Sequence, residues 1–115
     1  MTTEAIKPVR LEDRKIFTPE EGLSRQVLAY DGRLMLVRHL MRPGWSGARH
    51  SHPHDQLVYV IGGHIQFQTG TTMFDARAGD SFVVAGGIEH QAHALEESEV
   101  LDVFTPIRED YAESK

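Results

Sequence analysis

Cysteine is absent from the 115 residues of this chain. Disulfide bonds, thiolate zinc sites and cysteine nucleophiles are therefore excluded. Any transition metal must be bound through nitrogen and oxygen ligands. Lysine is scarce as well, and acidic residues outnumber basic ones by 17 to 12, giving a formal net charge of −5. Nucleic-acid binding needs clustered basic residues, so we expect no nucleic-acid partner.

Long hydrophobic runs are also missing. No apolar stretch approaches the roughly 18 residues that a membrane-spanning helix needs. Residues 1–10 lack the apolar segment of a secretory signal. These absences predict a cytoplasmic protein without membrane contact. The length, with 40% hydrophobic and 25% charged residues, indicates one globular domain.

Turn-forming pairs recur at short intervals, among them Asp31-Gly32, Pro43-Gly44 and Gly62-Gly63. Between them lie short runs rich in Val, Leu, Ile, Phe and Tyr, a pattern typical of an all-β sandwich or barrel. No segment shows a convincing helical period, and residues 106–114 are interpreted as a tail. The expected strands are 24–30, 33–41, 47–52, 56–61, 64–69, 73–76, 81–84, 90–95 and 99–105.

The two ends of the chain are expected to differ. Residues 1–20, with two prolines and mixed charge, are interpreted as an N-terminal arm that lies on the barrel or on a partner chain. Residues 21–115 are expected to form the barrel and its short C-terminal tail. Residues 57–61 are apolar throughout, as expected for a strand covered on both faces. Because the edges of an open barrel must be covered, we expect a homodimer.

All seven histidines fall between positions 39 and 93, and His50, His52 and His54 lie within five residues. On a strand, the side chains of His50 and His52 would point to the same face and could reach a single ion. His54 is interpreted either as a residue at the mouth of a pocket or as a solvated loop residue. The histidines without an evident partner or metal role are His39, His64 and His93.

The spacing of glycines and histidines carries a family resemblance. Residues 44–63 follow the pattern G-x5-H-x-H-x3-E-x6-G, and residues 79–94 follow G-x5-P-x-G-x2-H-x3-N. Together they resemble the two motifs of the cupins. The resemblance implies a single cupin domain, a small double-stranded β-helix or jelly-roll barrel.

Three positions depart from those motifs, with Gln56 in place of Glu, Ala85 in place of Pro and Ala94 in place of Asn. Only the first bears on chemistry. Three neutral imidazoles and one amide oxygen would leave the full charge on a divalent ion, which makes it a stronger Lewis acid for anionic substrates. Ni, Zn, Mn and Fe all remain candidates. The ligands implied by the resemblance are His50, His52, Gln56 and His90.

The C-terminal strand expected at 99–105 places Asp102 and Phe104 on one face. Arg108 follows Pro106 and could fold back over the mouth of the barrel. The string Leu-Asp-Val-Phe-x-Pro-x-Arg-x-Asp, with His-Ser-His-Pro-His-x-Gln upstream, resembles the KdgF-type cupins of pectin and alginate breakdown.

That resemblance implies conversion of 4,5-unsaturated monouronates, carboxylated sugars released by lyases, into linear 4-deoxy-5-keto-uronates. The ring would open by protonation at C4, addition of water at C5 and collapse of the hemiketal. In this interpretation Asp102 shuttles the proton, Arg108 holds the substrate carboxylate and Phe104 forms an apolar wall. Neither a redox change nor an organic cofactor is required.

Other interpretations stay open at this point. Asp102 and Arg108 could form a structural ion pair, and Phe104 could be ordinary core. A metal-containing cupin could bind or sense a small acid or sugar without catalysis. A redox metal at the same ligands would instead suit an O2-dependent dioxygenase.

Overall fold

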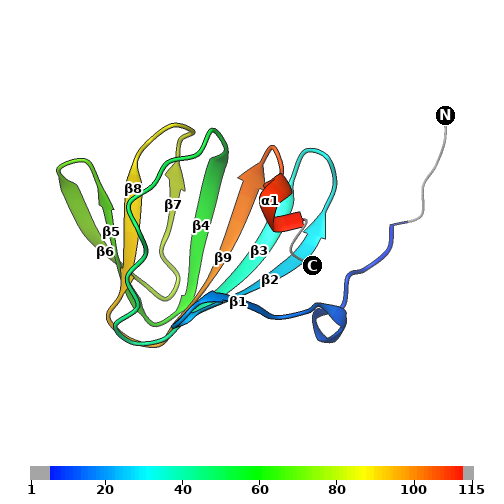
Figure 1. The fold of residues 1–115 in the computed structure, drawn as a ribbon, viewed down its shortest axis with the longest axis horizontal. Coiled ribbons are helices and arrows are strands. Elements are labelled where there is room, and N and C mark those ends of the chain that lie inside the picture. Colours follow the sequence, from blue (N-terminus) through cyan, green and yellow to red (C-terminus); the bar gives the residue numbers. More distant parts are fainter. Residues whose placement is uncertain (1–5, 113–115) are drawn as a thin grey trace.

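The computed structural model describes residues 6–112, and nine strands in this range form two antiparallel sheets (Figure 1). The larger sheet has the order β1-β2-β3-β9-β4-β7 and the smaller the order β6-β5-β8. The all-β jelly-roll expectation is confirmed. The elements are a 3-10 turn (Leu11–Asp13), β1 (Phe17–Glu20), β2 (Leu23–Tyr30), β3 (Met35–Met41), β4 (Asp55–Gly62), β5 (His64–Thr69), β6 (Thr72–Arg77), β7 (Ser81–Val84), β8 (His90–Ala94), β9 (Ser98–Thr105) and α1 (Glu109–Ala112).

Strict alternation builds the inner face of the larger sheet. In β3 and β9 every second residue is buried, as two-residue periodicity requires when one face meets the core. One cluster of buried residues, including Val60, Ile65 and Val100, lies between the two sheets. A second, around Met35 and Phe104, lies toward α1. Each fully buried side chain of this size contributes about 1.5–3 kcal/mol relative to an exposed one.

The segment expected as a strand at 47–52 is not one. It follows β8 through single bridges only, with the Gly47 N–H donating to the Ala92 carbonyl at 2.9 Å and His50 bridging His90. Pro53 lacks an N–H, so no ladder continues past this stretch. The histidines are therefore held by a loop alongside a strand.

The expected tail also contains structure. Residues 109–112 form one helical turn, α1, in which the amides of Tyr111 and Ala112 both donate to the Arg108 carbonyl at 3.0 Å. A turn this short is not stable alone. It is stabilised by packing of Tyr111 and Ala112 against the second core cluster. No other helix in residues 6–112 is classed as α, and none there has the length and apolarity to cross a membrane.

The outer face of β4 contradicts the expectation of a strand covered on both sides. Within this chain Leu57 and Tyr59 are each 45% exposed and Ile61 is 42% exposed. Val83, paired with Leu57 on the edge strand β7, is 69% exposed. No layer of the described chain covers these side chains.

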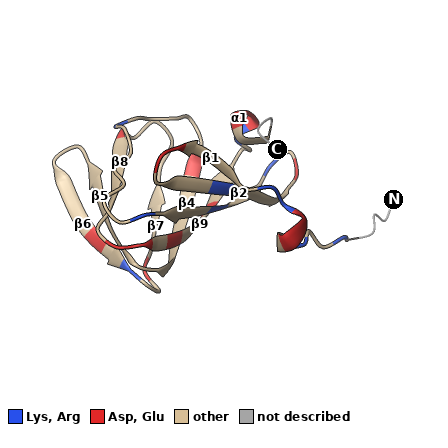
Figure 2. Ribbon diagram, turned by 60° about the horizontal axis from the view of Figure 1, so that its bottom comes forward, with Lys and Arg blue, Asp and Glu red and all other residues tan. Residues whose placement is uncertain are grey.

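The N-terminal region combines an arm with an edge strand. Residues 17–20 form β1 and pair with β2, Arg14 exchanges hydrogen bonds with Gln26 and Val27 of β2, and the residues before it extend away from the barrel (Figure 1). Ile6, Leu11 and Ile16 in the arm are at least half exposed. Lys and Arg are scattered over the arm, strands and loops and do not gather on one face (Figure 2). The domain boundary expected at residue 20 stays a prediction.

Candidate metal centre and pocket

Three histidines converge inside the barrel. His50 and His52 come from the loop before β4, and His90 opens β8. One ring nitrogen from each lies within 4.8 Å of the others. The other nitrogen, Nδ1, faces a backbone carbonyl, which only accepts hydrogen bonds: Ala48 at 2.9 Å, His54 at 3.1 Å and Ile88 at 2.8 Å respectively.

These carbonyls fix the tautomer of all three rings. Nδ1 carries the hydrogen, so each Nε2 presents a lone pair toward the shared space. Burial lowers the pKa of His90 below its ordinary value of 6.5. Burial and the charge of Arg108 lower the pKa of His52. The lowered pKa values favour the neutral rings of His52 and His90, and converging acceptors fit a cation.

The turn that carries His52 is anchored from the second motif. The Gly87 N–H donates to the His52 carbonyl at 2.8 Å, and the Gly86 N–H donates to the Asp55 carboxylate at 2.8 Å. A Cβ at Gly86 would collide with the Pro53 carbonyl, and Gly87 has φ of +85°. Both glycines are therefore required here, and they follow Ala85, where the cupin motif has proline.

Gln56, on β4, supplies a fourth acceptor. Its Oε1 lies 3.1 Å from Nε2 of His52, and its Nε2 donates to Oδ1 of Asp102 at 2.8 Å. Because Nε2 of His52 carries no hydrogen, the first contact joins two acceptors that face the same point. The donor set of three imidazole nitrogens and one amide oxygen suits a divalent transition metal.

Asp102 lies on the inner face of β9 and is 3% exposed. Its second oxygen, Oδ2, is 2.7 Å from Nδ1 of His39. The alternative of an ion pair with Arg108 is wrong, because Arg108 binds Asp110 instead, through Nε at 3.2 Å and Nη2 at 3.0 Å. Burial alone would raise the pKa of Asp110, but the hydrogen bond and charge of Arg108 outweigh it and lower that pKa.

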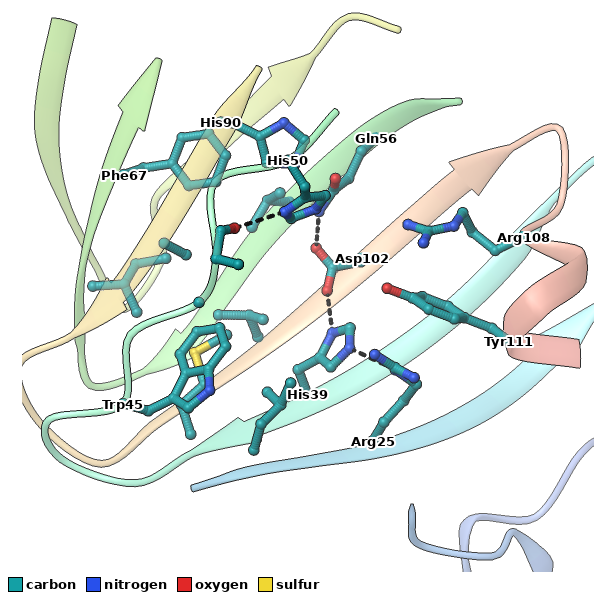
Figure 3. A pocket seen from close by; sticks show the side chains of 18 of the residues that line it. Arg25, His39, Trp45, His50, Gln56, Phe67, His90, Asp102, Arg108 and Tyr111 are labelled. Atoms are coloured by element: carbon teal, nitrogen blue, oxygen red, sulfur yellow. Dashed lines mark hydrogen bonds and ion pairs between the residues drawn. The ribbon is translucent and has the colours of Figure 1, made fainter. Parts of the chain in front are cut away.

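His39 is the site residue that the sequence interpretation missed. It was interpreted as a histidine without a partner, yet it is buried and bridges Asp102 and Arg25, whose Nε donates to His39 Nε2 at 3.0 Å. The one available signal was alternation, which places His39 on the same face as Met35, Val37 and Met41. Figure 3 shows the resulting row of hydrogen-bonded polar residues, called the polar row below, on β2, β3, β9 and β4. Its members are Arg25, His39, Asp102 and Gln56.

Tyr111 was missed as well. Its ring lies between two guanidinium groups, with Cζ of Arg25 3.8 Å and Cζ of Arg108 4.1 Å from the ring centre. Burial raises the pKa of the Tyr111 hydroxyl, so the phenol stays protonated. Its hydroxyl points toward the part of the cavity that Asp102 faces (Figure 3).

All the expected site residues except His52 line one cavity of about 250 Å3. Phe104 is 1% exposed, and its ring contacts those of His52 and Tyr111 at 5.8 and 5.6 Å between centres. It is therefore both core and cavity wall. The expected site residues that line the cavity are His50, Gln56, His90, Asp102, Phe104 and Arg108.

The remaining histidines lie outside the cavity lining. His54 is half-buried, and its ring contacts those of His52 and Phe104. His64, interpreted as having no partner, binds Asp75 at 2.9 Å on the smaller sheet. His93 is not among the residues that line the cavity, as its odd spacing from His90 predicts.

Comparisons with known proteins agree with this architecture. Residues 37–104 match the family described as the cupin domain. A structure of KdgF from Halomonas sp. is 31% identical, with a TM-score of 0.86, covering 91% of this chain and 99% of that one. An RmlC-like cupin from Shewanella frigidimarina NCIMB 400 is also 31% identical, with a TM-score of 0.87 and coverage of 93% and 96%.

More distant structures share the fold alone. Oxalate decarboxylase from Lactobacillus farciminis, in a formate complex, is 24% identical with a TM-score of 0.78 over 94% of this chain and 36% of that one. None of the curated proteins matches the sequence. The matched domain, the motif spacing and the similarity over 91% of the chain together establish that the chain belongs to the cupin family, as a small cupin of the KdgF type.

Proposed function

We propose that this protein converts 4,5-unsaturated monouronates into linear 4-deoxy-5-keto-uronates with the help of one divalent metal ion. The observation that carries the proposal is the buried carboxylate of Asp102. It lines the same cavity as the candidate metal ligands His50, Gln56 and His90, and as Arg108. A proton-transferring group, a cation site and a fixed positive charge suit a carboxylated substrate.

The metal would be held by three histidines and Gln56. When bound, it supplies a Lewis acid that stabilises negative charge developing on substrate oxygens. Ni, Zn, Mn and Fe all accept such ligands. Elemental analysis of protein purified without chelators should find about one divalent ion per chain, and protein that cannot be loaded with any of these metals would contradict the assignment. The proposed ligands are His50, His52, Gln56 and His90.

Asp102 would act first as a base. Both of its oxygens accept hydrogen bonds, from His39 and Gln56, so the resting group is an ionised acceptor. It takes the proton of the C1 hydroxyl as the bond between C1 and the ring oxygen breaks. It then delivers a proton to C4, and C5 becomes a ketone. The product is an isomer of the substrate, so this route does not need the addition of water at C5 that was expected from the sequence.

Arg108 and Phe104 would position the substrate. The bonds to Asp110 use Nε and Nη2 of Arg108, so Nη1 can donate to the substrate carboxylate. The guanidinium is held 5.1 Å from the Phe104 ring centre and stacked on Tyr111. The Phe104 ring presents an apolar wall beside the histidines, which limits where the sugar ring can lie.

The direct test supplies metal-loaded protein with unsaturated galacturonate freshly released by a lyase. Loss of the C=C absorbance should run far faster than the spontaneous reaction, without oxygen consumption. Matched protein treated with a chelator provides the baseline. A rate equal to the spontaneous one contradicts the proposal. Oxygen uptake would instead indicate a dioxygenase, and tight binding without turnover would indicate a sensor.

We also propose that the chain forms a homodimer. The outer face of β4 and β7 exposes apolar side chains, and the otherwise charged arm of residues 6–16 exposes Ile6, Val9, Leu11 and Ile16. An isologous pair would cover both at once. Light scattering should give twice the chain mass, and Leu57→Asp should give monomer. Met73→Asp, on the exposed side of β6, is the control and should leave the mass unchanged; monomeric wild-type protein contradicts the proposal.

A further inference from the structure

The hydrogen bonds of the polar row behind the metal centre can be donated in only one consistent direction. An arginine Nε–H can donate and cannot accept, so His39 Nε2 must accept from Arg25. The hydrogen of a neutral His39 ring is then on Nδ1, which donates to Asp102 Oδ2. Each bond thus determines the next, beginning at a group that never loses its charge.

The same logic extends to Gln56. Asp102 accepts at Oδ2 and, as a carboxylate, also accepts at Oδ1, so Gln56 must turn its NH2 group toward it. Its carbonyl oxygen is left facing the three histidines. The opposite tautomer of His39 would set an N–H against the N–H of Arg25 and a bare nitrogen against Asp102, leaving buried groups unsatisfied.

We propose that Arg25 and His39 are positioning residues that set the direction of this row and thereby keep the Gln56 oxygen turned toward the metal centre. The metal part of the inference rests on the proposed function, whereas the direction of the row does not. Tyr111 supports Arg25, because its ring stacks on the guanidinium at 3.8 Å.

This role explains why position 56 is Gln where the cupin motif has Glu. The side chain must donate one hydrogen to Asp102 and offer one oxygen to the histidine cluster, and an amide does both. An ionised glutamate would place an oxygen against Asp102 Oδ1, where the Gln56 nitrogen now lies at 2.8 Å. Asp102 and Gln56 are therefore chemically matched, with Arg25 and His39 fixing the match.

The first experiment measures the His39 tautomer in metal-free, full-length protein by NMR of the ring nitrogens near neutral pH. His39→Asn assigns the signal. We expect hydrogen on Nδ1 alone in the wild type and in Arg33→Met, a control that removes an exposed arginine. Arg25→Met should give a mixture of tautomers. Hydrogen on Nε2 of the wild-type ring, or an unchanged tautomer in Arg25→Met, would overturn the proposal.

The second experiment measures Zn2+ affinity alone, by competition with a chromophoric chelator. Arg25→Met should weaken binding about tenfold, the lower end of the usual range for groups behind a metal ligand. In a His39→Asn background, whose amide can donate to Asp102 without Arg25, the same change should cost less than about twofold. Equal losses in both backgrounds would show that Arg25 acts through charge or packing instead.

These readouts separate two failures. Neither needs a uronate, so a protein with the expected tautomer and Zn2+ response but no turnover would contradict the proposed function alone. Arg25→Lys guards against a folding defect, since its ammonium can still donate to His39. His39 should keep its hydrogen on Nδ1 in Arg25→Lys. Loss of that tautomer in this variant would count against the proposal.

Discussion

The metal-site histidines and His39 are held in opposite ways. Nδ1 of His50, His52 and His90 each faces a carbonyl only two residues away in the sequence. His39 instead contacts side chains 14 and 63 residues away, on neighbouring strands. Local loops orient the first group, whereas sheet register orients the second. Substitutions in the two groups should therefore differ in effect, and Gln56, which contacts both His52 and Asp102, links them.

Asp102→Asn should break the polar row while sparing the histidines, and it should have the largest effect. Turnover should fall at least about 100-fold, the usual range for loss of a general acid or base. Metal content should persist, because the three imidazoles keep their own carbonyl partners. Kinetics on lyase-generated uronate, with elemental analysis of the same samples, provide the measurement. Equal activity in the variant would show that Asp102 is only structural.

Gln56→Glu changes the residue that contacts both a metal-site histidine, His52, and the polar row, through Asp102. We expect the metal to be retained and turnover to fall about tenfold, because the added charge reduces Lewis acidity and faces Asp102. The variant should also melt at a lower temperature than wild type. Adding Asp102→Asn should recover the melting temperature without recovering turnover. Failure of the double variant to recover stability would argue against direct pairing of these two side chains.

Arg108→Ala tests substrate binding separately from metal binding and proton transfer. Losing one charge-assisted bond to the substrate carboxylate should raise KM about tenfold, with a smaller change in kcat. Arg33→Ala is the matched control, since Arg33 pairs with Asp31 on an exposed turn. A large fall in kcat at unchanged KM would place Arg108 in the proton-transfer step instead.

The smallest expected effect concerns pH. His52 and His90 have pKa values lowered from 6.5 in the folded chain, so the unfolded chain binds protons more readily. Metal-free protein should therefore lose stability as pH falls below about 6.5, with the loss continuing down to the lowered pKa values. Thermal melts across this range measure it, and His90→Gln should show a shallower dependence. A melting temperature that rises over the same interval would contradict the assignment of neutral rings.

The contrast between local and long-range contacts also explains what the sequence could reveal. Motif spacing predicted the barrel and the converging histidines, because their geometry depends on nearby residues and glycine turns. Alternation correctly placed Asp102 and Phe104 on one face of β9. The partners of Asp102 could not be read this way, since they depend on the register of β3 and β4 against β9.

Three other features needed the structure. The segment at 47–52 has the sequence pattern of a strand, but the structure holds it against β8 by isolated bridges only. The charged helical turn at 109–112 has no recognisable period, yet tertiary packing stabilises it and brings Tyr111 into the site. The apolar pattern of 57–61 suggested cover on both faces, although residues 6–112 cover only one.

The most direct test of the account is the reaction run in D2O with metal-loaded protein, followed by NMR of the product at early times. If Asp102 delivers the proton from one fixed side, C4 should carry a single deuteron in one configuration. Asp102→Asn should lose this product along with its rate. Deuterium distributed equally over both faces of C4, or product formed no faster than without protein, would contradict a proton shuttle at Asp102.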